Sequence, residues 1–480
     1  MNRVIIIFCT TFIVFFAGIS QTIFADTTEV PSIILKHISL DMDINYSVEE
    51  LSATAILDIK NIGDKPVQNI PLQLGRLMQI KNVTDAQGNP LEYKNDIVLF
   101  EDWQKIQVNQ MYVSLTSPLN ENQTVSISIQ YEGTLVGYTE SGMLYVRDKI
   151  DESFTIIRDD ALAFPRISLP SIQKLRAFRR DNFMFNAKIT VPKDLTVATG
   201  CKEKEIISND SSNSWVFESV EPVPFLNITI APYNLSQVDE ISIYSFPDDS
   251  IGASVVSHAI ENANKKYKQW FGNLPSTSQL NIIEIPTGFG SQASLTGGII
   301  QTADAFHDNK QLVQLYHELS HLWQPPELDI PACRWNEGLA MFLQQRMASI
   351  LDSAMSVDEY IGNRYKNLSQ MINDDPRLSE IPMIDYGKNN MTDYSYHIGM
   401  YMFYFLYKVM GDESFDKHLH NYFQSYQKQG ATNQQFVTLM TKNSPPNVKT
   451  IFNDWLLTTN WTNKISSTDS VADILNEYRH

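Results

Sequence analysis

The sequence has little cysteine and few basic residues. Its 480 residues include 3 cysteines, and 37 Lys and Arg stand against 55 Asp and Glu, for a formal net charge of −18. So few cysteines exclude a disulfide-rich scaffold and a cysteine-based zinc module. An acidic surface repels phosphate, which argues against a nucleic-acid partner. A composition of 43% hydrophobic and 19% charged residues excludes disorder throughout, and the length suggests two or three domains.

One apolar run stands out, at the N-terminus. Val4 to Phe16 follows a single positive charge at Arg3, and small residues lead from there to Ala25. This pattern predicts a signal peptide over residues 1–25, cleaved near Ala25, and hence a secreted or periplasmic protein. An uncleaved membrane anchor is the alternative, although the run is shorter than the ~20 residues of a full span. No later stretch approaches membrane length.

Cleavage would remove Cys9 and leave two cysteines, Cys201 and Cys333. In an exported chain these two residues form either one disulfide or two buried thiols. The sequence leaves both readings open.

Residues 26–238 are predicted to form an all-β domain. Runs such as 53–59, 125–131 and 185–191 alternate apolar and polar residues and are separated by turn signals. A large antiparallel sandwich or saddle fits this pattern.

Residues 239–465 are predicted to form a second, mainly helical domain, followed by a tail over 466–480. The pattern changes to strands at 241–244, 281–285 and 297–302 and to helical periodicity. The expected helices are 251–271, 309–323, 334–352, 395–410, 413–428, 432–442 and 447–457.

The chemistry is carried by an HExxH motif, His317-Glu-Leu-Ser-His321. Residues four apart share one helix face, so both imidazoles can bind one metal ion. Glu318 lies one step round the helix and can accept a proton from a water activated by that metal. Glu337, in Trp335-Asn-Glu-Gly-Leu-Ala, is the natural third ligand. Two His and one carboxylate leave zinc an open position, the catalytic arrangement.

These motifs resemble the aminopeptidase N-like zinc metallopeptidase family, the gluzincins that also include the leukotriene hydrolases. The resemblance implies a β saddle domain, a thermolysin-like catalytic domain ending near Trp455, one Zn²⁺ per chain and a peptide substrate. It also implies a short form, without the helical-repeat domain that ends many members. Tyr396-His397-Ile-Gly399 matches the family's Tyr-x-x-Gly, whose phenol donates to the oxyanion. Tyr394 and His397 are the rival candidates.

Two departures from the family pattern affect the site. Fifteen residues separate His321 from Glu337, fewer than is usual in the family. The family also has a glutamate that binds the substrate's α-amine, and here the matching position is Leu295. A leucine cannot pair with an ammonium group. The substrate strand is predicted to include Ala293, Ser294, Leu295, Gly297 and Gly298, running beside an extended peptide.

The sequence therefore predicts an exported zinc peptidase whose aminopeptidase specificity is in doubt. Either another acid (Asp159, Asp160 or Glu284) takes the amine, or no free N-terminus is required. The alternatives are a zinc endopeptidase or non-peptide hydrolase on the same scaffold, and a catalytically silent binding module. The oligomeric state is not predicted, and Gln344 and Asp352 are candidate partners of the ligand histidines.

Overall fold

The computed structural model describes residues 31–135, 147–178, 182–274, 280–293, 298–352 and 355–479. Residues 32–480 group into one compact unit. The predicted signal peptide lies outside the described residues. None of the helices in the described ranges is long and apolar enough to cross a membrane.

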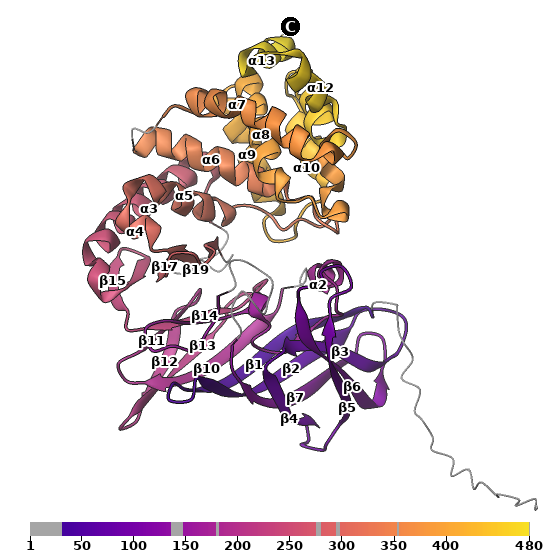
Figure 1. Ribbon diagram of the computed structural model, residues 1–480, viewed down its shortest axis with the longest axis vertical. Coiled ribbons are helices and arrows are strands. Elements are labelled where there is room, and N and C mark those ends of the chain that lie inside the picture. Colours follow the sequence, from indigo (N-terminus) through magenta and orange to yellow (C-terminus); the bar gives the residue numbers. More distant parts are fainter. Residues whose placement is uncertain are drawn as a thin grey trace, which may run out of the picture. The chain divides into compact units, whose positions relative to one another are not determined.

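The first half of the chain is built of strands, drawn from indigo to magenta in Figure 1. Its strands are β1 (Ile33–Asn45), β2 (Glu50–Asn61), β3 (Val67–Gly75), β4 (Met78–Asp85), β5 (Glu92–Leu99), β6 (Gln107–Leu119), β7 (Thr124–Gly133), β8 (Thr155–Arg158), β9 (Arg166–Ile167), β10 (Met184–Pro192), β11 (Thr196–Thr199), β12 (Glu203–Ser208), β13 (Ser212–Glu218), β14 (Asn227–Ala231) and β15 (Asn234–Val238).

All of these strands except β15 form three sheets around one apolar core. The orders are β12-β13-β10-β1-β2-β7-β4, β5-β6-β3-β9 and β11-β14-β8. Alternate residues of β1, such as Ile38, Leu40 and Met42, are buried, as a period of two requires. All pairs are antiparallel except β1 with β10, which are parallel. The all-β N-terminal region expected from the sequence is confirmed.

A five-stranded sheet follows, in the order β15-β16-β17-β19-β18. It adds β16 (Ile241–Ser245), β17 (Leu280–Ile285), β18 (Gln292–Ala293) and β19 (Gly298–Thr302). Every residue of β17 is buried, because both faces of the sheet are covered. Ile282 and Ile299 pack with the helices, whereas Ile283 and Ile300 pack toward the three-stranded sheet. Since β15 pairs with β16, the boundary drawn at residue 238 falls within this sheet.

The rest of the chain is mainly helical, drawn from pink-red at α3 through orange to yellow in Figure 1. Its helices are α3 (Ser250–Phe271), α4 (Asp304–His307), α5 (Leu312–His321), α6 (Trp335–Leu351), α7 (Val357–Asp374), α8 (Tyr394–Met410), α9 (Asp412–Tyr426), α10 (Asn433–Thr441), α11 (Asn447–Phe452), α12 (Asn460–Ser467) and α13 (Val471–Arg479), and α2 (Ile172–Phe178) lies in the first half. Short helical turns are η1 (Asp159–Ala161), η2 (Pro247–Asp249), η3 (Asn309–Gln311), η4 (Pro376–Ser379), η5 (Met383–Asn389) and η6 (Asn453–Leu457).

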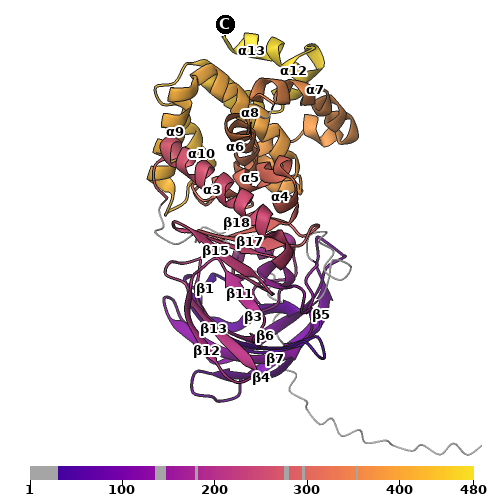
Figure 2. The same cartoon turned by 90° about the vertical axis from the view of Figure 1, so that its left-hand side faces the viewer.

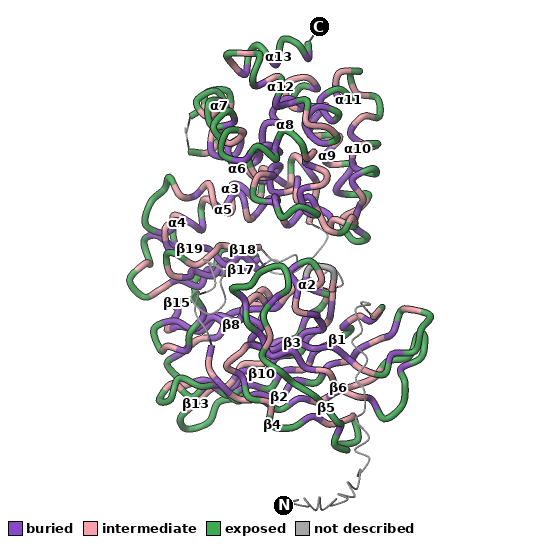
Figure 3. Tube along the Cα trace, turned by 45° about the vertical axis from the view of Figure 1, so that its right-hand side comes forward, coloured by how far each residue is buried: buried purple, intermediate pink, exposed green. Residues whose placement is uncertain are grey.

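The helices expected from periodicity all form, whereas α7, α12 and α13 were not predicted. The predicted tail contains α13, whose residues Val471, Ile474 and Tyr478 are buried in the main helical core. These residues recur at helical spacing, but the helix has only 9 residues, so the apolar stripe covers few positions in the sequence. Figure 3 shows the buried residues in purple running through α6 and α8, the centre of this core.

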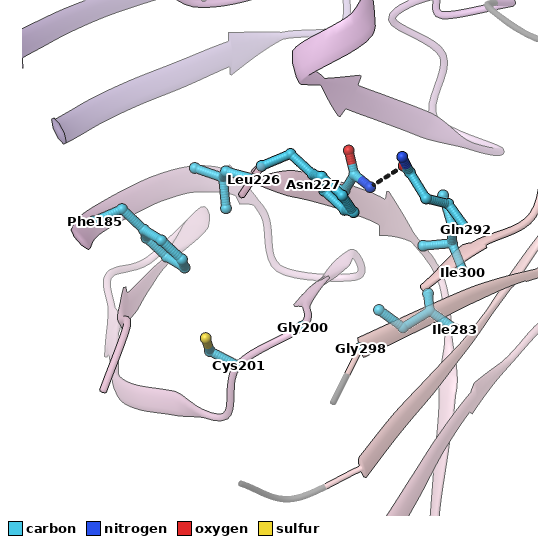
Figure 4. A pocket seen from close by; sticks show the side chains of 10 residues that line it. Phe185, Gly200, Cys201, Leu226, Asn227, Ile283, Gln292, Gly298 and Ile300 are labelled. Atoms are coloured by element: carbon cyan, nitrogen blue, oxygen red, sulfur yellow. Dashed lines mark hydrogen bonds between the residues drawn. The ribbon is translucent and has the colours of Figure 1, made fainter. Parts of the chain in front are cut away.

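Cys201 and Cys333 are separate buried thiols. Cys201 lies beside a small pocket lined by Phe185, Gly298 and Ile300 (Figure 4). The reading of two buried thiols therefore holds for this structure.

Candidate metal centre

Two helices bring the candidate ligands together. His317 and His321 lie on the same face of α5, whose buried residues Leu315 and Leu319 pack into the core. Glu337 lies in the first turn of α6, where the positive end of the helix dipole favours a carboxylate. All three side chains are largely buried, with 11%, 19% and 9% of His317, His321 and Glu337 exposed.

The spacing of the three donor atoms fits a tetrahedral zinc site. Glu337 Oε2 lies 3.3 Å from His317 Nε2 and 3.3 Å from His321 Nε2. Two ligands that bind one zinc at about 2.1 Å with tetrahedral angles stand about 3.4 Å apart. The residues present therefore fit the metal, and the short spacing between His321 and Glu337 does not keep the carboxylate away.

A hydrogen bond sets the orientation of His317. Its Nδ1 lies 2.8 Å from Gln344 Oε1, two helical turns further along α6 than the ligand carboxylate. The amide oxygen accepts from Nδ1–H, which leaves the Nε2 lone pair for the metal. Asp352, the other candidate from the sequence, instead accepts from the Tyr316 hydroxyl at 2.9 Å. Gln344 is thus the partner that touches a ligand.

Glu318 lies beside the substrate strand predicted from the sequence. Its carboxylate accepts a hydrogen bond from the backbone N–H of Ala293 in β18. Burial raises the pKa of Glu318 to about 7, against the opposing effect of His317. Ala293 is therefore placed next to the site. Gly298, on β19, instead lies against Gly200 and lines the small pocket beside Cys201. Ser294, Leu295 and Gly297 lie outside the described residues.

Of the three candidates on α8, Tyr396 faces the metal centre. Its ring stacks parallel to the His317 imidazole, with centroids 6.1 Å apart and an interplanar angle of 5°. Burial and the nearby Glu337 carboxylate raise the pKa of Tyr396, so the phenol keeps its proton. Tyr394 and His397 line a different pocket with Arg364 and Met371. The structure thus separates the three.

Arg334 is a member of the site that sequence reasoning missed. Its Nη2 donates to Glu337 Oε1 and, over 3.2 Å, to the Tyr396 hydroxyl oxygen. The residue has a left-handed backbone, with φ of 61°, directly before α6. That conformation, which no motif indicates, turns the guanidinium toward the ligand carboxylate.

The short loop between α5 and α6 is held at two points, one in its middle and one at the start of α6. Glu327 Oε2 accepts from the Arg334 backbone N–H over 3.2 Å, at the start of α6. Leu328 N–H donates to the Ala431 carbonyl over 3.0 Å, which ties the loop to the segment before α10. These bonds fix where α6 begins and so where Glu337 points.

Two motif glycines set the distance between α6 and α8. A Cβ at Gly338 would lie 2.5 Å from the Gly399 Cα, and one at Gly399 would lie 3.0 Å from the Gly338 Cα. The backbones can approach this closely only because neither residue has a side chain. Glu337 and Tyr396 come from these two helices, so this contact brings the ligand and the phenol together.

The other acids weighed for the substrate amine lie elsewhere. Asp159 pairs with Arg166 in a buried ion pair. Glu284 is buried next to Asp249 and His307. Neither is placed among the residues around His317. Asp160 lies near Asp148, whose pKa is raised by burial and further by the Asp160 charge.

Comparison with known proteins agrees with this site. Residues 298–455, which contain all three candidate ligands, match the profile of the peptidase family M1 domain. The chain carries a peptidase family M1 domain. The aminopeptidase N-like family of zinc metallopeptidases recognised from the HExxH and Asn-Glu-Gly motifs is therefore confirmed. No match was found among curated protein sequences.

Solved structures share the fold of the M1 domain and of the β region before it. An M1 zinc metallopeptidase from Deinococcus radiodurans aligns with a TM-score of 0.65 and 16% identity, over 88% of this chain and 94% of that one. A mutant of the D. radiodurans enzyme was solved with a Tyr-Ser-Ala substrate, and it aligns with a TM-score of 0.64 at 16% identity over the same shares. Native yeast LTA4 hydrolase aligns with a TM-score of 0.65 and 15% identity, over 89% of this chain and 68% of that one.

Proposed function

We propose that this protein is an exported zinc-dependent peptidase that hydrolyses peptide bonds. The observation that carries the proposal is the convergence of His317, His321 and Glu337, with donor atoms 3.3 Å apart, beside Glu318 and Tyr396. A structural zinc site would have a closed ligand set, whereas three protein ligands leave one position open. A solved relative of the same fold was captured with a tripeptide, which supports a peptide substrate.

Bound at these three residues, zinc would polarise the scissile carbonyl and lower the pKa of a water molecule. Glu318 takes a proton from the attacking water and returns it to the leaving amine, as general base and then general acid. Tyr396 donates its phenolic proton in a hydrogen bond to the oxyanion as charge develops there. Gln344 holds the His317 ring in the orientation that these steps need.

The substrate backbone is proposed to lie along β18. This strand is at the edge of the five-stranded sheet, paired on one side with β19. An edge strand offers free N–H and C=O groups with which an extended peptide can pair. Because Ala293 N–H also contacts Glu318, a peptide bound there would pass the proton-transfer group.

We further propose that a free substrate N-terminus is not strictly required, since Leu295 stands where the family has its amine-binding glutamate. The test compares a fluorogenic peptide with the same peptide acetylated at its N-terminus. Acetylation is expected to lower kcat/KM by less than about tenfold, the smaller end of what a hydrogen bond to a charged group contributes. A loss of 100-fold or more would contradict this and show that another acid binds the amine.

Export is proposed on the N-terminal sequence alone. Intact-mass measurement of the protein recovered outside the cytoplasm tests it, and a mature chain that starts near Asp26 is expected. A chain that still starts at Met1 would instead support the membrane anchor.

A further inference from the structure

A second cluster of metal-ligating side chains lies outside the peptidase site. Asp249 ends the turn η2, Glu284 lies near the end of β17, and His307 ends α4. One donor atom from each lies within 4.8 Å of the other two. The turn η2 and helix α4 both pack against α3, and α4 also contacts β19, the strand paired with β17. Figure 2 shows α3, α4 and β17 as neighbours.

Glu284 has a buried oxygen without a partner. The residue is 0% exposed, and its Oε2 accepts a hydrogen bond from Phe246 N–H over 2.8 Å. Its Oε1 is buried and has no donor within hydrogen-bond distance among the described residues, and the Glu284 side chain also lies within hydrogen-bonding reach of the Asp249 carboxylate. On the same face of β17, Ile282 packs into the helical core, so the buried Glu284 side chain faces the helices. A carboxylate oxygen left unpaired in such surroundings is costly unless something neutralises it.

The Asp249 side chain does not cap the helix that follows it. It occupies the N-cap position of α3, where an aspartate normally accepts a hydrogen bond from the first turn, yet its side chain makes no such bond. Instead Asp249 Oδ1 lies 2.9 Å from His307 Nε2. Its carboxylate also lies beside that of Glu284, and burial together with this neighbour raises the pKa of Glu284 to about 9.

We propose that Asp249, Glu284 and His307 bind a divalent transition-metal ion of the zinc class. Zinc binds both carboxylate oxygens and imidazole nitrogens. Calcium binds oxygen ligands, so an imidazole ligand disfavours calcium at this cluster. Two ligands of one tetrahedral zinc stand about 3.4 Å apart. The donors here lie within 4.8 Å of one another, so the pair that is furthest apart would have to approach by up to about 1.4 Å. His307 has 55% of its side chain exposed and is free to make that movement.

Such an ion would connect η2, β17 and α4, which precede the helix α5 of the peptidase site in the chain. Gly252 in the first turn of α3 already touches α4, since a Cβ there would lie 2.1 Å from the Phe306 carbonyl oxygen. The ion would bridge the same junction and tie it to β17, whose neighbour β19 leads through α4 into α5. Its role is structural, and the proposal does not depend on peptidase activity.

The test measures zinc in the full-length mature protein. After dialysis against a chelator and reloading with zinc chloride, elemental analysis is expected to give two zinc ions per chain, one at each site. A His317→Ala/His321→Ala variant is expected to keep one. In that variant added zinc should still raise Tm, because a ligand that binds only the native state stabilises it. Added calcium should not.

Replacement of the second cluster completes the test. His307→Ala should remove one zinc from the wild-type background and abolish the zinc-dependent rise in Tm in the double-alanine background. Asp249→Asn should act in the same direction. His258→Ala is the matched control, because His258 is also an exposed histidine, on α3, and bonds only the Ser254 carbonyl.

Two results would overturn the proposal. One is a single zinc per chain in the wild type with none in the His317→Ala/His321→Ala variant. The other is two zinc ions that persist after both His307→Ala and Asp249→Asn. Either result would mean that Asp249 and Glu284 hold no metal and that a proton shared between their carboxylates neutralises them instead. A failure of hydrolysis with two zinc ions bound would count against the peptidase and leave this site standing.

Discussion

The described part of the protein has two clusters of carboxylates and imidazoles. The first cluster is His317, His321 and Glu337, and the second cluster is Asp249, Glu284 and His307. Each contains a buried glutamate, and the charges around the two glutamates are opposite. Burial acts to raise the pKa of Glu337, but the His321 imidazole and the Arg334 guanidinium hold it well below its usual range. Glu284 is equally buried, and the carboxylate beside it, Asp249, raises its pKa further. Burial alone therefore does not decide the charge of a glutamate; the charges that face it do.

The clusters also differ in how the chain builds them. Three ligands of the first come from two successive helices, and two lie four residues apart on α5. The ligands of the second come from a turn, a strand end and a short helix, 23 or more residues apart along the sequence, since 307 − 284 = 23 is the smallest gap. A glycine sets the close packing in each case, Gly338 at the first and Gly252 at the second.

The largest effect on turnover is expected at Glu318, which lies beside the first cluster and has no counterpart described at the second. Glu318→Gln removes the proton acceptor, so turnover should fall by about 10²–10⁴-fold. Zinc content should stay the same, because Glu318 is not among the three ligands. Peptide hydrolysis and elemental analysis on the same sample measure both.

The control is Glu413→Gln, which changes an exposed glutamate in the first turn of α9. It should leave turnover unchanged. If the Glu318→Gln enzyme kept its turnover, the proposed proton transfer would be wrong.

The next effect concerns the phenol beside the first cluster. Tyr396→Phe removes one oxyanion donor and keeps the ring that stacks on His317, so kcat should fall by about 10²–10³-fold. KM should change little, since the bond forms only as charge develops. Steady-state kinetics separate the two quantities.

Tyr394→Phe is the matched control two residues away on α8, and it should leave kcat nearly unchanged. A larger fall for Tyr394→Phe than for Tyr396→Phe would reverse the assignment.

The glycine contact can be tested by stability. A Cβ at Gly338 meets backbone atoms of Gly399 and the Ser395 carbonyl oxygen, none of which can rotate away. Gly338→Ala should therefore lower the free energy of unfolding by about 1–3 kcal/mol, the usual cost of overpacking. Urea denaturation of the metal-free protein measures it.

Gly362→Ala supplies the contrast, because nothing lies within 4 Å of a Cβ there, on helix α7. Alanine is the better helix former, so this change should raise stability by up to about 1 kcal/mol. Equal effects of the two alanines would show that the α6–α8 contact does not matter.

The residue that supports His317 is expected to matter less than the two catalytic groups. Gln344→Ala removes the hydrogen bond to Nδ1, so zinc affinity at the first cluster should weaken by about 10–100-fold. Competition with a chromogenic chelator measures it. The zinc at the second cluster should be unaffected, which sharpens the contrast between the two.

Gln345→Ala is the neighbouring control, since the Gln345 amide donates to the Met355 carbonyl instead. It should leave zinc affinity unchanged. Similar losses in both variants would mean that α6 tolerates neither change and that the His317 contact is not specific.

The sequence by itself determined the features that depend on spacing within one helix or strand and the residues that belong to recognisable motifs. His317 and His321 share a helix face because 3.6 residues make a turn, and alternation along 53–59 predicts a half-buried strand before any partner is known. The recognisable Asn-Glu-Gly and Tyr-x-x-Gly segments then supplied Glu337 and Tyr396. Arg334 and α13 carried no such signal. A left-handed residue looks ordinary in a sequence, and a helix of 9 residues shows its apolar spacing over too short a stretch to stand out.

Only the tertiary structure decided which distant residues meet. Gln344 could be told from Asp352 only by where each side chain ends, at His317 or at Tyr316. Asp249, Glu284 and His307 look like a capping residue, a strand residue and a surface histidine until β17, α3 and α4 pack together. The physical reason is that a metal-binding geometry is set by distances of a few ångströms between side chains, and separation along the chain fixes those distances only within one helix or strand.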